Sequence, residues 1–154
     1  PSAKCLLFTW DDIPVGFIAI LNSPRKGKPK GFNTSRLVIL PDYQGLGLSS
    51  IILNFCGGIL KSLGDDYVLY MKTIHDKVGD FMNRSENWEA TSYNGKIRNE
   101  KTNIYEGKRY QNRLRRKSHC YKFIGKPIYG YEELLKPIKE LREQKILNRQ
   151  LKIF

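Results

Sequence analysis

The sequence predicts a single α/β domain built on one mixed sheet, an α+β arrangement, and three observations lead to that prediction. The chain has 154 residues, of which 40% are hydrophobic and 27% charged, as is usual for one folded domain. Three strand-like segments come before the first helix, and a strand and a second helix follow it. The strongest helical pattern starts directly after a glycine-rich turn. We therefore expect one hydrophobic core.

The first elements are three strands. Residues 4–10 are rich in aromatic and branched side chains, residues 11–14 (Asp-Asp-Ile-Pro) favour a turn, and residues 15–21 are apolar again, which together predict a hairpin. Residues 22–32 contain two prolines, two glycines and four basic residues and predict a loop. Residues 36–40 then predict a third strand, which Pro41 ends.

The next elements are a helix, a strand and a short helix. Apolar residues recur at intervals of three and four through residues 48–63, so we expect all of them on one helical face. They are Leu48, Ile51, Ile52, Phe55, Cys56, Ile59, Leu60 and Leu63. Residues 67–74 predict a strand and residues 75–84 a short helix.

The C-terminal half is less regular. Residues 88–93 and 119–124 are strand candidates, and residues 94–117 between them are polar and strongly basic. Residues 132–151 carry Leu134, Leu135, Ile138, Leu141 and Leu147 at roughly helical spacing, which predicts a terminal amphipathic helix. We expect residues 1–126 to form the main domain and residues 127–154 to form a helical extension packed on it.

Several classes of protein do not fit this sequence. No apolar stretch approaches the ~20 residues needed to cross a bilayer and no signal-peptide pattern is present, so we expect a cytoplasmic protein without a membrane partner. Cys5, Cys56 and Cys120 are odd in number and have apolar neighbours, which favours reduced, packed thiols. His75 and His119 stand alone and no Cys-x-x-Cys occurs, so we expect no metal site.

The turn Gln44-Gly45-Leu46-Gly47-Leu48-Ser49 has the composition of a phosphate-binding site. Glycines let a backbone approach an anion closely, and the N–H groups at a helix start bind it with the help of the helix dipole. No Gly-Lys-Ser/Thr follows, which excludes a P-loop, and Ser50 stands where a dinucleotide-binding motif needs its third glycine. A tight turn without a ligand is the alternative interpretation.

Residues 36–50 resemble the central motif of the GNAT acetyltransferases, in which a strand and a proline precede Gln/Arg-x-x-Gly-x-Gly/Ala. Gln44 and Gly47 match the motif, and Ser49 replaces its last small residue. Val15-Gly16-Phe17 is similar to the family's second hairpin strand. The resemblance predicts a GNAT-like acyl-CoA-binding fold, shortened at its N-terminus because the family usually has a strand and two helices before the hairpin.

The resemblance implies acetyl-CoA as cosubstrate. Backbone groups of residues 37–39 would pair with the pantetheine arm like an added strand, residues 45–50 would hold the pyrophosphate, and Gln44 would lie at the entrance to the turn. The implied cofactor-binding residues are Leu37, Val38, Ile39, Gln44, Gly45, Leu46, Gly47, Leu48, Ser49 and Ser50.

The catalytic residues of the family are harder to find. Its acid is commonly a Tyr five residues before the Phe of a Gly-Phe pair, and counting back from Trp88 places Asn83 there, which cannot donate a proton at neutral pH. A base used by some members falls at Met71. His75 then becomes the candidate base because histidine titrates near neutrality, with a surface or helix-start histidine as the plainer interpretation. Tyr93, Cys120 and Tyr121 are weaker candidates on the acceptor side.

Residues 96–122 contain ten basic and two acidic residues, a surplus of eight within a net charge of +12 for the whole chain. Interleaved tyrosines suit single-stranded or looped RNA, whereas a solvated basic loop is the alternative. Two functions follow. We predict an N-acetyltransferase that acts on an amine acceptor of unknown identity. The alternative is a catalytically weak or inactive module that binds nucleic acid or a protein through residues 96–122.

Overall fold

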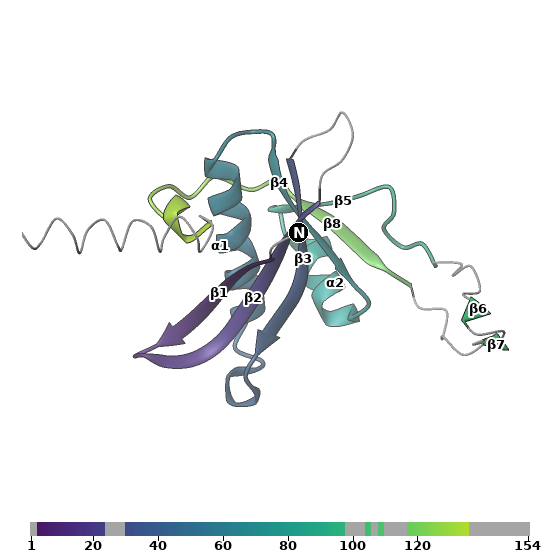
Figure 1. The fold of residues 1–154 in the computed structure, drawn as a ribbon, viewed down its shortest axis with the longest axis horizontal. Helices are drawn as coiled ribbons and strands as arrows, with labels where there is room; N and C mark the ends of the chain where they lie inside the picture. The colour runs from purple at the N-terminus through teal and green to yellow at the C-terminus, as the bar shows by residue number, and fades with distance from the viewer. Residues whose placement is uncertain (1–2, 24–29, 98–103, 106–107, 110–116, 136–154) are drawn as a thin grey trace, which may run out of the picture.

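The computed structural model of the chain describes residues 3–23, 30–97, 104–105, 108–109 and 117–135 (Figure 1). Its centre is a mixed six-stranded sheet in the order β1-β2-β3-β4-β8-β5, and β6 and β7 form a separate two-stranded sheet. The strands are β1 (Ala3–Trp10), β2 (Ile13–Ser23), β3 (Lys30–Ile39), β4 (Tyr67–Thr73), β5 (Trp88–Ala90), β6 (Ile104–Tyr105), β7 (Lys108–Arg109) and β8 (His119–Phe123). The helices are α1 (Leu48–Ser62), α2 (Asp76–Arg84) and the short 3-10 turns η1 (Pro41–Tyr43) and η2 (Glu132–Leu135). The predicted α+β mixed sheet is confirmed.

Both α-helices lie on the same face of this sheet. Gly57 of α1 packs against the ring of Phe123, and Gly79 of α2 packs against the ring of His119. Because side chains alternate between the faces of a strand, these two residues of β8 point to the same side. β3 pairs with β4 in parallel, whereas all other neighbours in the sheet are antiparallel. Each helix therefore connects two strands of the same direction across one face.

The core lies between this face and α1. Ile52, Leu53, Cys56, Ile59 and Leu60 of α1 are at most 2% exposed. They pack against the fully buried Ile18, Ile20, Leu69 and Met82 and the other members of one cluster. Burying these side chains is the main stabilising contribution to such a fold.

The buried surface of α1 differs from the predicted stripe. Ile51 is 61% exposed and Leu63 38%, so the expectation that all eight apolar positions share one buried face was wrong. Leu53, outside that stripe, is fully buried. The reason is that the sheet contacts the side of the helix that carries Leu53, since Gly57, one turn after Leu53, packs against Phe123 of β8. α1 therefore buries a wider surface, rotated away from Ile51.

Three boundaries also differ from the sequence-based expectation. β2 and β3 extend into the predicted loop, because Asn22 pairs with Phe32 and Ser23 with Gly31. β5 ends at Ala90 and not at residue 93, since residues 91–95 form a turn in which Gly95 has a positive φ of 73°. At the start of the predicted terminal helix, the structure has the 3-10 turn η2 (Glu132–Leu135), and residues 136–154 lie outside the described residues.

The three cysteines are all free thiols, but only Cys56 and Cys120 are packed. Cys5 is exposed, which corrects the expectation for that residue. The next residue of β1, Leu6, is 8% exposed and belongs to the core, so Cys5 points to the opposite face of the sheet. Among the described helices, none is long and apolar enough to cross a membrane.

Candidate cofactor site and an adjoining pocket

A gap opens between β3 and β4. The two strands pair only from Lys30 with Tyr67 to Asn33 with Tyr70. Beyond that point, residues 34–39 of β3 and 71–73 of β4 have no register with each other. Ser35 forms a bulge against β2 at the same level, and a bulge bends its strand and increases its twist. The gap therefore widens toward the carboxyl ends of the two strands.

Backbone groups of β3 line this gap. The N–H of Leu40 donates to the carbonyl of Val15 at 2.9 Å, and Val38 lies opposite Phe17 in the same ladder. Alternate residues of an antiparallel strand turn their polar groups to opposite sides, so Leu37 and Ile39 face the gap and Val38 faces β2.

The side chain of Gln44 reaches back to this edge of β3. Its Nε2 donates to the carbonyl of Ile39 at 2.9 Å. This bond fixes the loop after β3 over the end of the gap and leaves the N–H of Ile39 and both polar groups of Leu37 on the open side.

The glycine turn follows β3 and the short 3-10 turn η1 and leads into α1 (Figure 1). Gly45 and Gly47 have φ values of 85° and 77°, which other residues adopt only with strain. A Cβ at Gly45 would meet nothing within 4 Å, and the nearest atom to one at Gly47 would be Ser50 Oγ at 3.9 Å. The glycines therefore keep an open surface at the start of the helix.

The backbone N–H groups of residues 45–49 point to no acceptor within the described chain. The first turn of α1 contains no acidic residue, and Ser50 Oγ donates to the carbonyl of Gly47 at 2.6 Å. Consecutive free N–H groups at the positive end of a 15-residue helix form a favourable anion site. Because this turn follows β3, the anion site lies at the mouth of the gap.

The predicted catalytic residues lie at different places. His75 precedes α2, and its backbone N–H donates to Thr73 Oγ1 at 3.0 Å. Its side chain is exposed just beyond the end of β4. Met71, 9% exposed, belongs to the core. Asn83 lies on α2 and lines a separate pocket.

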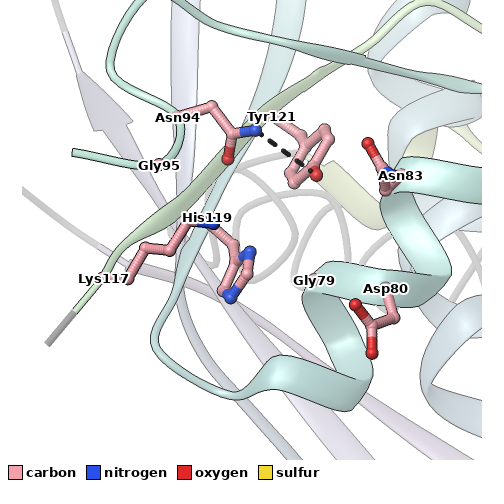
Figure 2. Close-up of a pocket in the computed structure, with 8 residues that line it drawn as sticks. All are labelled: Gly79, Asp80, Asn83, Asn94, Gly95, Lys117, His119 and Tyr121. Carbon is pink, nitrogen blue, oxygen red and sulfur yellow. Dashed lines mark hydrogen bonds between the residues drawn. The ribbon is translucent and has the colours of Figure 1, made fainter.

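That pocket has a volume of about 180 Å³ and lies between α2, β8 and the turn after β5 (Figure 2). It is lined by Gly79, Asp80, Asn83, Asn94, Gly95, Lys117, His119 and Tyr121. His119 Nε2 lies 2.9 Å from Asp76 Oδ1. No side chain fits at Gly79, because the His119 ring occupies that space.

The weaker candidates on the acceptor side, Tyr93, Cys120 and Tyr121, differ in their exposure. Tyr93 is 67% exposed, whereas Tyr121 is 3% exposed and lines the pocket. Burial raises the pKa of Cys120, and the nearby charge of Lys72 opposes that shift.

The sequence did not predict the pairing of His119 with Asp76, since the two residues are 43 positions apart and no local pattern connects them. Within the described ranges, no cluster of three His, Cys, Asp or Glu residues could hold a metal ion.

No protein-family model matches the chain, and no curated protein is similar to it in sequence. Solved structures are similar, and the chain has the fold of the GNAT acetyltransferases, with the mixed sheet and both helices in common.

Three of these structures show the extent of the likeness. Naa50 of Arabidopsis thaliana in complex with the bisubstrate analogue CoA-Ac-MVNAL is 20% identical, with a TM-score of 0.51 over 78% of this chain and 70% of that chain. The IAA acetyltransferase from Bacillus cereus is 12% identical, with a TM-score of 0.52 over 79% and 78%. The ribosomal-protein-S18-alanine N-acetyltransferase from Escherichia coli is 12% identical, with a TM-score of 0.51 over 83% and 75%.

Proposed function

We propose that this chain is an N-acetyltransferase that transfers the acetyl group of acetyl-CoA to an amine acceptor. Two neighbouring features are the main support for the proposal. The first is the row of free backbone N–H groups at residues 45–49, and the second is the gap beside it, where the edges of β3 and β4 are unpaired. The first feature suits a pyrophosphate and the second suits an extended amide-containing arm. Naa50 of similar fold was solved with a CoA-containing analogue, which supports the same cofactor here.

In this proposal, the arm of the cofactor lies in the gap between β3 and β4. Ile39 offers it a backbone N–H and Leu37 a backbone carbonyl, because Gln44 already occupies the Ile39 carbonyl. The pyrophosphate binds residues 45–50 at the start of α1. Val38 does not bind the arm through its backbone, because its N–H and carbonyl face β2.

Acetyl transfer requires the acceptor amine, a hydrogen-bond donor at the thioester oxygen and a base that takes the amine proton. The amine nitrogen attacks the carbonyl carbon, the C–N bond forms, and the C–S bond breaks to release the thiolate, which takes up a proton. A backbone N–H beside the carbonyl oxygen stabilises the charge that develops there. We assign this donor to the N–H of Leu37, because the thioester lies at the end of the arm away from the pyrophosphate turn and Leu37 is the gap-facing residue farther from that turn.

We assign the proton transfer from the amine to His75. It is the exposed imidazole just beyond the end of β4, on the side where the gap is open. Asn83, at the position of the usual family acid, lines the other pocket and has no proton to give. The proposed enzyme therefore depends on positioning and one base.

Calorimetric titration with acetyl-CoA tests the cofactor site. Gly47→Glu places a carboxylate and a Cβ where the pyrophosphate would approach, so we expect at least a hundredfold weaker binding than in the parent protein. Gly130→Glu is the matched control, because Gly130 also has a positive φ, 88°, and open space around it. The control should bind acetyl-CoA like the parent.

Thiol release in the presence of a panel of amines then tests transfer. We expect release that depends on the amine and disappears in Gly47→Glu. Equal affinity of the parent and Gly47→Glu would overturn the cofactor site. Tight cofactor binding without thiol release for any primary amine, peptide N-terminus or polyamine would overturn the transferase activity alone.

A further inference from the structure

The pocket between α2 and β8 contains polar side chains that have no partner among the described residues. Asp80, Asn83 and Lys117 form no side-chain hydrogen bond or ion pair with other residues of the described chain. They come from two walls, since Asp80 and Asn83 lie on α2 and Lys117 directly precedes β8 (Figure 2). Their donors and acceptors are therefore available to a molecule that enters the pocket.

Tyr121 supplies the second observation. Its side chain is 3% exposed, and its hydroxyl oxygen accepts a long hydrogen bond of 3.5 Å from Asn94 Nδ2. Among the described residues, no group accepts a hydrogen bond from this hydroxyl, which lines the pocket. Its proton is therefore available to a ligand atom or a water in the pocket.

The charges and the size define the kind of ligand. Lys117 presents an ammonium and Asp80 a carboxylate on opposite walls (Figure 2). A simple anion would leave the Asp80 carboxylate without a partner, and a simple cation would leave Lys117 and the Tyr121 proton without one. The volume of about 180 Å³ equals roughly six water molecules at ~30 Å³ each. A small molecule that carries both charges satisfies both walls.

We propose that this pocket binds a small zwitterion of the size of a free amino acid. Its carboxylate accepts hydrogen bonds from the Tyr121 hydroxyl and the Lys117 ammonium, and its ammonium donates to the Asp80 carboxylate. The amides of Asn83 and Asn94 lie at the sides of the pocket (Figure 2). Gly79 and Gly95 also line the pocket, and the His119 ring packs against Gly79.

The site is separate from the gap between β3 and β4. β8 lies on the other side of β4 from that gap, because the sheet order is β3-β4-β8. Met71 of β4, whose side chain is buried, lies opposite Tyr121 in the ladder. The proposed zwitterion site therefore does not rest on the proposed acetyl transfer, and its occupancy should not depend on CoA.

Nuclear magnetic resonance titration with three matched probes tests this site. The probes are L-alanine, its amide, which lacks the negative charge, and N-acetyl-L-alanine, which lacks the positive charge. We expect L-alanine to shift the backbone amide signals of Gly79 and Gly95, with a dissociation constant in the millimolar range or below. The other two probes should bind at least about tenfold more weakly, since each leaves one wall unpaired.

Three variants assign the contacts. Lys117→Met should weaken L-alanine binding about tenfold or more without changing the amide probe, and Asp80→Asn should weaken L-alanine without changing N-acetyl-L-alanine. Tyr121→Phe removes only the hydroxyl and should weaken both probes that carry a carboxylate. Lys126→Met, an exposed lysine outside the pocket, is the control and should bind all probes like the parent.

Some results would overturn the proposal. Absence of localised shifts at about 50 mM L-alanine would exclude the site. Equal affinity for all three probes would exclude recognition of both charges. Displacement of L-alanine by saturating CoA would show that the pocket is not separate from the cofactor site, whereas unchanged shifts would support the assignment.

Discussion

His75 and His119, the two histidines of the chain, occupy different surroundings. His75 is exposed at the start of α2, and its imidazole is bonded to no other described side chain. His119 is held by Asp76 and packed under Gly79, with only 12% of its side chain exposed. The exposed imidazole of His75 is therefore the one that we propose as the base.

Replacement of His75 by Gln should lower the rate of thiol release by roughly a hundredfold, because a positioned base contributes about that much or more. Initial rates with saturating acetyl-CoA at a fixed pH measure this effect. His119→Gln should lower the rate much less, and an unchanged rate in His75→Gln would remove that residue from the mechanism.

The cysteines also differ in burial and therefore in reactivity. Burial raises the pKa of Cys56 to about 12, while Cys5 is exposed. At pH 8 only about one Cys56 in ten thousand would be the reactive thiolate. Iodoacetamide should therefore modify Cys5 in the folded protein and reach Cys56 only after unfolding. Mass spectrometry of the digested protein measures this, and equally fast labelling of both residues would contradict the buried position of Cys56.

At the scale of elements, α1 combines the anion site with the largest contact surface. Its first turn is open, its middle packs on the sheet, and Gly58 allows the segment after β8 to approach closely. Asn54 on the same helix accepts a hydrogen bond from Trp88 Nε1 at 2.8 Å, which ties α1 to β5. The helix start is thus held rigidly relative to the sheet.

Two neighbouring isoleucines of α1 provide a matched test of this packing. Ile52→Ala should reduce the free energy of unfolding by about 2–5 kcal/mol, because Ile52 is 2% exposed and its removal leaves a cavity. Ile51→Ala should change it by less than about 0.5 kcal/mol, because Ile51 is 61% exposed. Urea denaturation measures both values. Equal losses would contradict the orientation of α1, in which Ile52 is buried and Ile51 is exposed.

For the whole molecule, the net charge of +12 favours anionic partners, and coenzyme A is one. Much of that charge comes from residues 96–122, most of which lie outside the described residues. No described contact favours nucleic acid over a solvated loop there. The binding module therefore remains an alternative that a direct measurement has to decide.

Replacement of Arg113, Arg115 and Arg116 by Ser tests this segment while leaving Lys117 of the pocket unchanged. If the segment binds polyanions, the variant should elute from an RNA column at clearly lower salt, because fewer phosphate contacts reduce the salt dependence of binding. Affinity for acetyl-CoA should stay within about twofold of the parent. Identical elution of parent and variant would identify the segment as a solvated loop.

The sequence by itself determined the order of the elements, the start of α1 and the glycine turn. Each of these depends on neighbouring residues, because helical periodicity, strand composition and positive φ at Gly45 and Gly47 are local properties. The resemblance added the fold of the sheet, which the structure confirms. The C-terminal helix stays a prediction beyond η2.

Only the tertiary structure decided which parts of that sequence meet. The gap exists because β3 and β4 separate after Asn33 and Tyr70, and the ladder with β2 decides that Leu37 and Ile39, but not Val38, face it. The pocket brings α2 and β8 together across 43 positions of sequence. Ile51 and Ile52 are chemically identical, and the packing of α1 alone exposes one and buries the other. Such pairings are set by contacts distant in sequence, for which periodicity and composition carry no information.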